Sequence, residues 1–226
     1  MVLVSHRHKF IFLKTRKTAG TSIEMYLEPA CTDENLEISE KREMVKSPAG
    51  IVGARVINAK AGEWGPHMRA FRVKKELGED LFDQYLKISS VRNPYDRCLS
   101  LFLWRKRSLK PNELSPDDFR FAFEFFLLNE QWHNDLQITH IKGSNILNDV
   151  IRYESLVSDL QRISALVGFK SDVGDLAITK STKASRAGKP ISDFFTKKAK
   201  DTVLKRMAWV FDEYNYSPNI EDARTG

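Results

Sequence analysis

The chain has 226 residues, of which 42% are hydrophobic and 29% are charged, and its net charge is 36 − 30 = +6. The length allows one sizeable domain, and the composition is that of an ordinary globular protein with, from its fourteen phenylalanines, an aromatic interior. The positive charge favours an anionic ligand or acceptor, but it does not distinguish a nucleotide from a sulfated glycan or a nucleic acid.

The cysteines and the N-terminus bear on the compartment. Two cysteines, Cys31 and Cys98, make no disulfide framework. The first ten residues are too short and too charged for a signal peptide, and no apolar run approaches the length of a membrane span. We therefore expect a soluble, cytoplasmic protein or the excised catalytic domain of a longer one.

The stretch from Lys9 to Glu24 predicts a strand, a tight loop and a helix, in that order. Residues 10–13 are apolar strand formers, and an apolar-periodic segment starts at Ile23. A loop of small residues at a helix N-terminus presents backbone N–H groups that attract an anion. Lys17 adds a mobile positive charge that suits phosphate or sulfate oxygens.

The same loop also fits a plain strand-to-helix turn with a solvated lysine. A P-loop NTPase would place Gly-Lys-Ser/Thr at the end of the loop, whereas here Lys17 precedes Gly20. This order disfavours hydrolysis of ATP or GTP and makes a nucleotide kinase a weak third alternative.

The next segments carry weaker signals. The helix that begins at Thr21 should stop at Leu27, and residues 31–46 read as a polar surface segment. Residues 51–57 predict a strand or a loop edge, and residues 61–67 are rich in Gly, Pro and other loop residues. Residues 71–77 predict one or two helical turns.

A second strand is predicted over residues 85–91. Asn93 can cap the following helix, Pro94 suits its first position, and the helix should run to about Arg107. The strand would carry Arg92 at its carboxyl end, where open α/β sheets bind ligands.

The second half of the chain predicts more helix. Ser115 starts a helix whose apolar face is Phe119, Phe123, Phe126 and Leu127, a core stripe. A short strand over 150–154 and helices over 156–167 and 196–214 follow. Residues 179–189 form a basic loop that composition alone describes as solvated. With no internal repeat or linker, we expect one domain over residues 1–226.

Two motifs resemble the PAPS-dependent sulfotransferases, where PAPS is 3′-phosphoadenosine 5′-phosphosulfate. Residues 17–22, KTAGTS, look like the 5′-phosphosulfate loop of that family. Residues 91–100 are similar to its 3′-phosphate motif, in which an arginine and a serine eight residues later hold the phosphate; these match Arg92 and Ser100. The resemblance covers about residues 9–218 and is closest to the carbohydrate sulfotransferases. Arg16 departs from it, because many members carry proline there, and could alter the loop's shape.

The resemblance implies a single α/β domain with a central, mainly parallel sheet flanked by helices and a P-loop-like phosphosulfate loop. It also implies that a basic late loop folds over the nucleotide, whereas the membrane anchor of many Golgi members has no counterpart here. The implied binding residues for PAPS and its product PAP are Lys17, Thr18, Ala19, Gly20, Thr21, Ser22, Arg92, Ser100, Lys180, Lys183, Arg186 and Lys189.

Sulfuryl transfer needs a positive group at the bridging oxygen and a base for the acceptor hydroxyl. Lys17 suits the first role, whereas Lys14 near the strand end could simply face solvent. His67 resembles the family's histidine in an H-x-x-A segment, although a lone histidine in such a loop is equally often structural. The alternative bases are His133, His140 and Glu24. The histidines and cysteines show no metal-ligand spacing, so no metal site is expected.

Two classes of function remain open at this point. The chain is either a PAPS-dependent sulfotransferase or a non-catalytic, basic protein that binds a polyanion or nucleic acid; the latter lacks any recognised nucleic-acid motif. The acceptor is suggested by the resemblance to be a sugar hydroxyl. A small metabolite, a lipid or a peptide tyrosine stays open, as does the oligomeric state.

Overall fold

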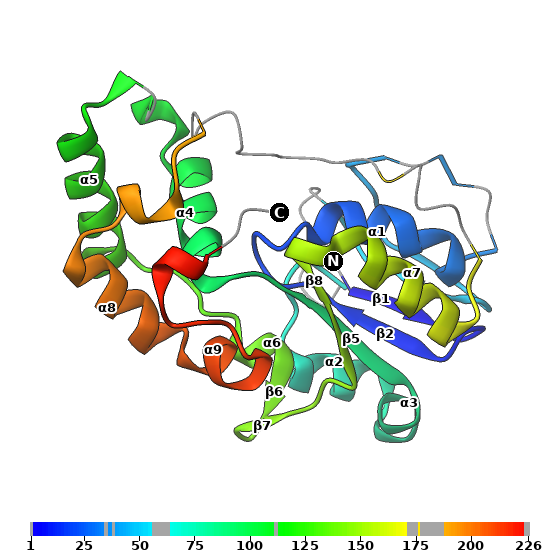
Figure 1. Ribbon diagram of the computed structural model, residues 1–226. Coiled ribbons are helices and arrows are strands. Elements are labelled where there is room, and N and C mark those ends of the chain that lie inside the picture. Colours follow the sequence, from blue (N-terminus) through cyan, green and yellow to red (C-terminus); the bar gives the residue numbers. More distant parts are fainter. Residues whose placement is uncertain are drawn as a thin grey trace. The chain divides into compact units, whose positions relative to one another are not determined.

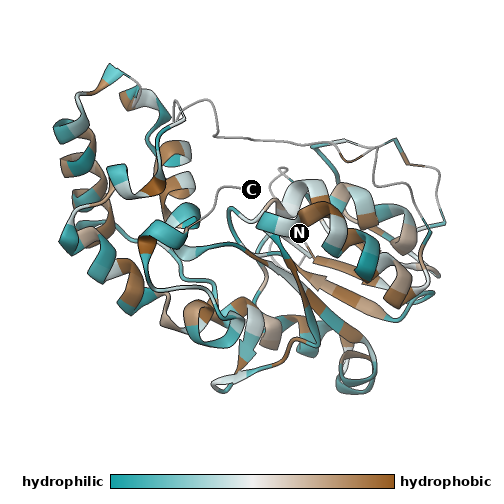
Figure 2. Cartoon of the chain, in the orientation of Figure 1, coloured by the Kyte–Doolittle hydropathy of each residue, from teal (hydrophilic) through white to brown (hydrophobic). Residues whose placement is uncertain are grey.

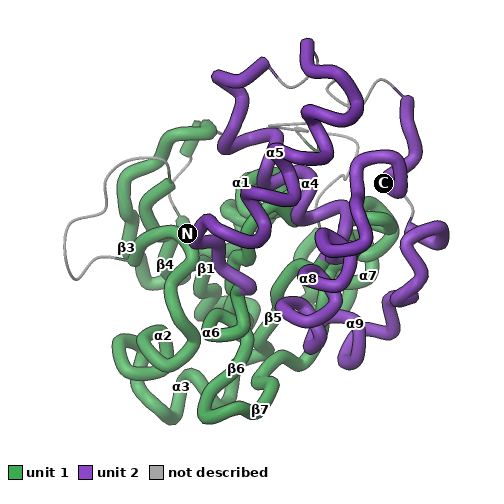
Figure 3. Tube along the Cα trace, turned by 90° about the vertical axis from the view of Figure 1, so that its left-hand side faces the viewer, with its two compact units in different colours: residues 1–91, 135–179 green, residues 92–134, 180–226 purple. Residues whose placement is uncertain are grey.

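A computed structural model describes residues 2–33, 36–37, 39–55, 64–110, 113–170, 176 and 188–223. The chain divides into two compact units, each built from two separate stretches of sequence (Figure 3). Unit 1 contains Met1–Val91 and Asp135–Thr179, and unit 2 contains Arg92–Asn134 and Lys180–Gly226.

Unit 1 is built around a six-stranded sheet with the strand order β3-β4-β1-β2-β5-β8. These strands are β1 (Val2–Ser5), β2 (Phe10–Leu13), β3 (Val45–Ser47), β4 (Gly50–Val52), β5 (Leu86–Val91) and β8 (Asp149–Arg152). A separate pair, β6 (His140–Ile141) and β7 (Ser144–Asn145), is antiparallel.

The parallel part of the expected sheet is formed by three strands. β2 lies beside β5 in parallel, with Leu13 opposite Ser89, and β5 lies beside β8 in parallel. The carboxyl ends of these strands therefore meet at one edge of the sheet, which is where the loop after β2 begins. The remaining strands β1, β4 and β3 are antiparallel, so the sheet is mixed.

Helices cover both faces of this sheet (Figure 1). In unit 1 they are α1 (Gly20–Leu27), α2 (Ala70–Leu77), α3 (Glu79–Gln84), α6 (Leu136–Thr139) and α7 (Leu156–Val167). Alternate residues of β2 point to opposite faces: Phe10 and Phe12 pack with α1 and α7, whereas Ile11 and Leu13 pack with α2 and α3. This three-layer arrangement confirms the α/β class, and Figure 2 shows the apolar residues concentrated along the strands.

Unit 2 is helical. Its helices are α4 (Pro94–Arg105), α5 (Pro116–Asn129), α8 (Lys197–Arg206) and α9 (Ala208–Tyr214). Short 3-10 helices occur at η1 (Glu28–Cys31) and η4 (Tyr153–Ser155) in unit 1, and at η2 (Arg107–Leu109), η7 (Ile191–Phe194) and η8 (Ile220–Asp222) in unit 2. The single helix predicted over 196–214 is wrong in one respect, because Met207 leaves the helical conformation at φ −113° and separates α8 from α9.

The predicted aromatic interior lies mainly in unit 2. The ring of Phe102 on α4 is within 5.1–5.6 Å, centroid to centroid, of three phenylalanine rings on α5, namely Phe119, Phe123 and Phe126. Edge-on and tilted pairs of this kind add about 0.5–1.5 kcal/mol each to the burial of the rings. The apolar stripe of residues 119–127 is therefore a core stripe, as its spacing predicted.

No helix in the described ranges is long and apolar enough to span a lipid bilayer.

Candidate active site

The loop from Lys14 to Ala19 joins β2 to α1 and has an unusual backbone. Lys17 (φ 63°) and Ala19 (φ 59°) both adopt the left-handed conformation, which costs a residue with a Cβ roughly 1–2 kcal/mol. His67 (φ 56°) and Asp135 (φ 64°), which contact this loop, do the same. Strain of this kind persists only where the surroundings hold it in place, and it is common at functional sites.

A buried network of hydroxyl groups holds the loop from the side of β5. The Thr15 hydroxyl donates to the carbonyl of Ser90, and the Thr18 hydroxyl lies 2.7 Å from the Ser90 hydroxyl. All three residues are at most 3% exposed. The Thr18 hydroxyl, which the sequence suggested as a ligand donor, is thus part of this network.

A carboxylate from a distant segment holds the loop at Arg16. The backbone N–H of Arg16 donates to Asp135 Oδ2 at 2.7 Å, and its guanidinium donates to Asp135 Oδ1. A proline at position 16 could make neither bond, so this departure from the family pattern has a structural use. Neither Asp135 nor Ser90 was predicted; a pair of serines ending an apolar strand could have drawn attention to Ser90, whereas nothing in the sequence marks Asp135.

Lys14 is buried, so the expectation that it faces solvent was wrong. The aliphatic part of the Lys14 side chain packs against Gly20. A Cβ added at residue 20 would lie 2.7 Å from Lys14 Cγ, which explains why a glycine occupies this position. Its ammonium donates to Thr21 Oγ1 at 3.0 Å and to Glu24 Oε2 at 2.5 Å. Lys14 therefore fixes the first turns of α1.

The N-terminus of α1 suits an anion. Within the described residues, α1 begins at Gly20 without a side-chain cap and without an acidic residue in its first turn. By contrast, α4 and α5 do have side-chain caps, which are provided by Asn93 and Ser115. The first N–H groups of a helix have no intrahelical partner and carry the positive end of its dipole, so phosphate or sulfate is favoured there.

His67 contacts the start of the loop of residues 14–19. Its Nδ1–H donates to the carbonyl of Lys14 at 3.0 Å, which leaves Nε2 as the ring nitrogen with a lone pair. Burial, followed by the positive charge of Arg16, lowers the pKa of His67 from 6.5 to about 3, against the opposing effect of Asp135. His67 is thus neutral at pH 7, in the tautomer that a base requires.

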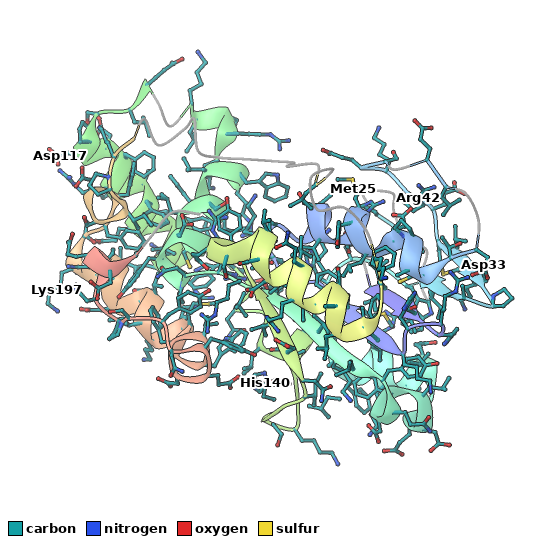
Figure 4. All side chains as sticks on the ribbon, turned by 45° about the vertical axis from the view of Figure 1, so that its right-hand side comes forward. Met25, Asp33, Arg42, Asp117, His140 and Lys197 are labelled. Atoms are coloured by element: carbon teal, nitrogen blue, oxygen red, sulfur yellow. The ribbon has the colours of Figure 1, made fainter. Side chains whose placement is uncertain are left out.

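The alternative bases are placed differently. Glu24 is completely buried and forms an ion pair with Lys14, so its carboxylate is already used in holding α1. His140 is buried on β6, far from the α1 residue Met25 in Figure 4, and its Nδ1 lies 2.9 Å from the Thr139 hydroxyl. His133 is exposed in unit 2. Of these candidates, His67 is the one for which a hydrogen bond to the backbone of the loop of Lys17 is described, through the carbonyl of Lys14.

The predicted 3′-phosphate residues lie at the start of unit 2. Arg92 is 5% exposed, and its Nε donates to Asp96 Oδ2 at 2.7 Å. The Asn93 side chain accepts the N–H groups of Tyr95 and Asp96 and thereby starts α4. Because Asp96 and Ser100 are four residues apart on α4, they share one face of the helix, and Asp96 orients Arg92 toward that face.

The late basic loop lies mostly outside the described residues. Lys180, Lys183 and Arg186 belong to that part, while Lys189 is described and exposed. Within the residues that the structure describes, no group of three or more His, Cys, Asp or Glu side chains is arranged to hold a metal ion.

Comparison with known proteins gives one match. The model of the sulfotransferase family matches residues 1–213, which include both the loop of Lys17 and the motif of Arg92. No curated protein and no solved structure matches the chain.

Proposed function

The chain belongs to the sulfotransferase family and is a transferase, and we propose that it moves a sulfuryl group from PAPS to a hydroxyl of a carbohydrate acceptor. The family match extends through stretches of both units, which supports the view that residues 1–226 act as one sulfotransferase-like domain. PAP is the nucleotide product in this proposal.

The donor groups of the chain fit a nucleotide with phosphate or sulfate at both ends. Residues 17–22 would hold the 5′ end, because they combine an uncapped helix N-terminus with the Lys17 ammonium. Arg92 and Ser100 would hold the 3′-phosphate, the arginine with its planar set of N–H donors. Lys180, Lys183, Arg186 and Lys189 are proposed as further contacts, on the resemblance alone.

PAPS, when bound, supplies the sulfuryl group. Lys17 places its positive charge where negative charge develops on the bridging oxygen as the S–O bond breaks, and its preorganisation makes this stabilisation large. His67 Nε2 accepts the proton of the acceptor hydroxyl as the new O–S bond forms. A pKa of about 3 makes His67 a weak base on its own, and a bound anion would raise that pKa toward the working pH.

The observation that carries the proposal is that a single loop contains Lys17 and also accepts a hydrogen bond from His67. His67 bonds to Lys14 at the beginning of this loop, and Lys17 lies three residues further on. The acceptor class is less tightly supported: the carbohydrate is inferred from the resemblance, and the family itself implies only an acceptor with a hydroxyl group.

Thermal unfolding with PAP, in EDTA without magnesium, tests the nucleotide part of the proposal. PAP at 100 times its Kd should stabilise the protein by about 2.7 kcal/mol and raise Tm, whereas AMP, which lacks the 3′-phosphate, should act only at much higher concentration. Equal effects of PAP, AMP and heparin would favour the non-catalytic polyanion-binding alternative. With binding established, mass spectrometry of candidate glycans incubated with PAPS would detect the added SO₃.

A further inference from the structure

We propose that Asp135 is a positioning residue of the transfer site, which holds Lys17 in its working conformation by clasping Arg16. The inference rests on the proposed function, because it assigns Asp135 a part in presenting the lysine that stabilises the leaving oxygen. Asp135 itself is not placed in contact with either substrate.

The contact between Arg16 and Asp135, called the clasp below, uses both oxygens of one buried carboxylate. Oδ2 accepts the backbone N–H of Arg16 at 2.7 Å, Oδ1 accepts its guanidinium, and Asp135 is only 4% exposed. The two residues are 119 positions apart in the sequence. A carboxylate that bonds simultaneously to the backbone and the side chain of one residue fixes the peptide plane as well as the charge, which an ordinary surface ion pair does not.

The clasp lies next to Lys17 and has a counterpart on the other side. Arg16, directly before Lys17, is held by Asp135, and Thr18, directly after it, is held by Ser90. Lys17 stands between these two anchors in the left-handed conformation and is partly exposed. An unanchored loop would relax toward right-handed backbone conformations at Lys17 and would move the ammonium away from its place.

The charges of the clasp also act on His67. Arg16 lowers the pKa of His67, whereas Asp135 raises it, so both partners lie close enough to influence the base. The guanidinium further neutralises a buried carboxylate that would otherwise repel an anion at the loop. The pair thus bears on both members of the proposed catalytic pair, Lys17 and His67.

Three substitutions separate the components of the clasp. Arg16→Ala removes the guanidinium and keeps the backbone N–H bond, Asp135→Asn keeps an acceptor oxygen and removes the charge, and Asp135→Ala removes both bonds. We expect kcat/KM for PAPS to fall about tenfold in the first two variants and about 100-fold in Asp135→Ala, as for other small misplacements of a catalytic group. Arg16→Ala combined with Asp135→Asn should lose less than the product of the single losses, because the residues act together.

Asp33→Asn is the matched control. Asp33 pairs with Arg7 in unit 1, but both side chains are about half exposed, and Asp33 lies at the periphery in Figure 4. This variant should keep the wild-type kcat/KM. If Asp135→Asn and Asp135→Ala, assayed below their Tm, also stay within twofold of the wild type, Asp135 has no positioning role and the proposal is overturned.

Measurements on the ligand-free protein test the clasp independently of sulfate transfer. Amide hydrogen exchange over residues 17–20 should be faster in Asp135→Ala than in the wild type and unchanged in Asp33→Asn. By NMR titration, Arg16→Ala should raise the pKa of His67 and Asp135→Asn should lower it. Unchanged exchange in Asp135→Ala would overturn the clasp even if the enzyme is active. A wild-type chain that binds no PAP would instead overturn the proposed function, whatever the exchange data show.

Discussion

The loop of residues 14–19 in unit 1 and the motif of residues 92–100 in unit 2 are held by opposite kinds of contact. The loop depends on Ser90, Asp135 and His67, which are 75, 119 and 53 residues away from their partners in the sequence. The motif depends on Asn93 and Asp96, which lie within four residues of the groups that they contact.

This difference predicts how each region responds to change. The loop keeps two strained residues in place by tertiary contacts, so a substitution far away in the sequence can disturb it. The motif keeps its shape as long as α4 forms, because a capping side chain and an i, i+4 ion pair are local to that helix. Substitutions in the loop should therefore alter the rate of transfer, whereas those in the motif should alter the recognition of one phosphate.

Lys17→Ala should give the largest effect. Removing a preorganised donor from a developing negative charge costs about 10²–10³-fold in kcat. Nucleotide affinity should fall as well, because Lys17 would also contact the bound ground state, so kcat/KM falls by more than kcat. Steady-state kinetics with PAPS together with calorimetry of PAP binding would separate the two losses.

Lys9→Ala is a close control for this variant. Lys9 is also a left-handed lysine (φ 50°) of unit 1, it precedes β2, and it is exposed. Its substitution should leave kcat and PAP affinity unchanged. If Lys17→Ala is no worse than Lys9→Ala, the loop lysine has no catalytic role and the contrast between the two regions loses its functional meaning.

His67→Ala should slow transfer by about 10²-fold or more, the usual contribution of a general base, and leave PAP affinity nearly intact. Single-turnover rates at saturating PAPS would measure the chemical step directly. His140→Ala is the comparison, because the His140 ring is buried on β6 with its Nδ1 beside the Thr139 hydroxyl, and we expect little effect on the rate. A wild-type rate in His67→Ala would move the base elsewhere, and Glu24 and His133 would be tested next.

Arg92→Ala should have a smaller and more selective effect. Loss of a charge-assisted contact to the 3′-phosphate, worth about 1.5–3 kcal/mol, weakens PAP binding roughly 10–100-fold. Binding of AMP, which has a 3′-hydroxyl, should barely change. Arg105→Ala, at the other end of α4, should affect neither ligand. Equal losses for PAP and AMP in Arg92→Ala would show that the motif does not recognise the 3′-phosphate.

Much of the fold was predictable because its signals are local. Asn93-Pro94 and Ser115-Pro116 marked helix starts that the structure confirms. α3, only six residues long, is too short for periodicity to reveal. β1 was not predicted, although it has the same four-residue length as the predicted strand β2. The break at Met207 was also hidden, because the apolar repeat of Ala199, Val203, Met207 and Phe211 continues across it.

The candidate site was predictable in its motifs and not in its supports. The order Lys17, Gly20, Thr21 within a strand–loop–helix pattern indicated an anion loop without any knowledge of the tertiary structure. That Lys14 is buried over Gly20, and that Asp135 holds Arg16, depends on how distant segments fold together. No local pattern distinguishes one aspartate from the others in an irregular stretch, so such a partner cannot be inferred from a single sequence.

The pH dependence of stability sharpens the contrast between the units, with effects smaller than those on transfer. Burial lowers the pKa of His67 in unit 1 to about 3, below the unfolded value of 6.5. The stability that the neutral imidazole contributes is therefore complete above pH 6.5 and is lost as the pH falls toward 3. At pH 5 the loss in the free energy of unfolding is about 2 kcal/mol. Burial raises the pKa of Tyr95 in unit 2 from 10.0 to about 12, so its contribution is complete below pH 10 and is lost as the pH rises toward 12. Urea unfolding should therefore show that His67→Gln flattens the acid limb alone and Tyr95→Phe the alkaline limb alone. An acid limb unchanged in His67→Gln would mean that this imidazole is not buried against the loop in solution.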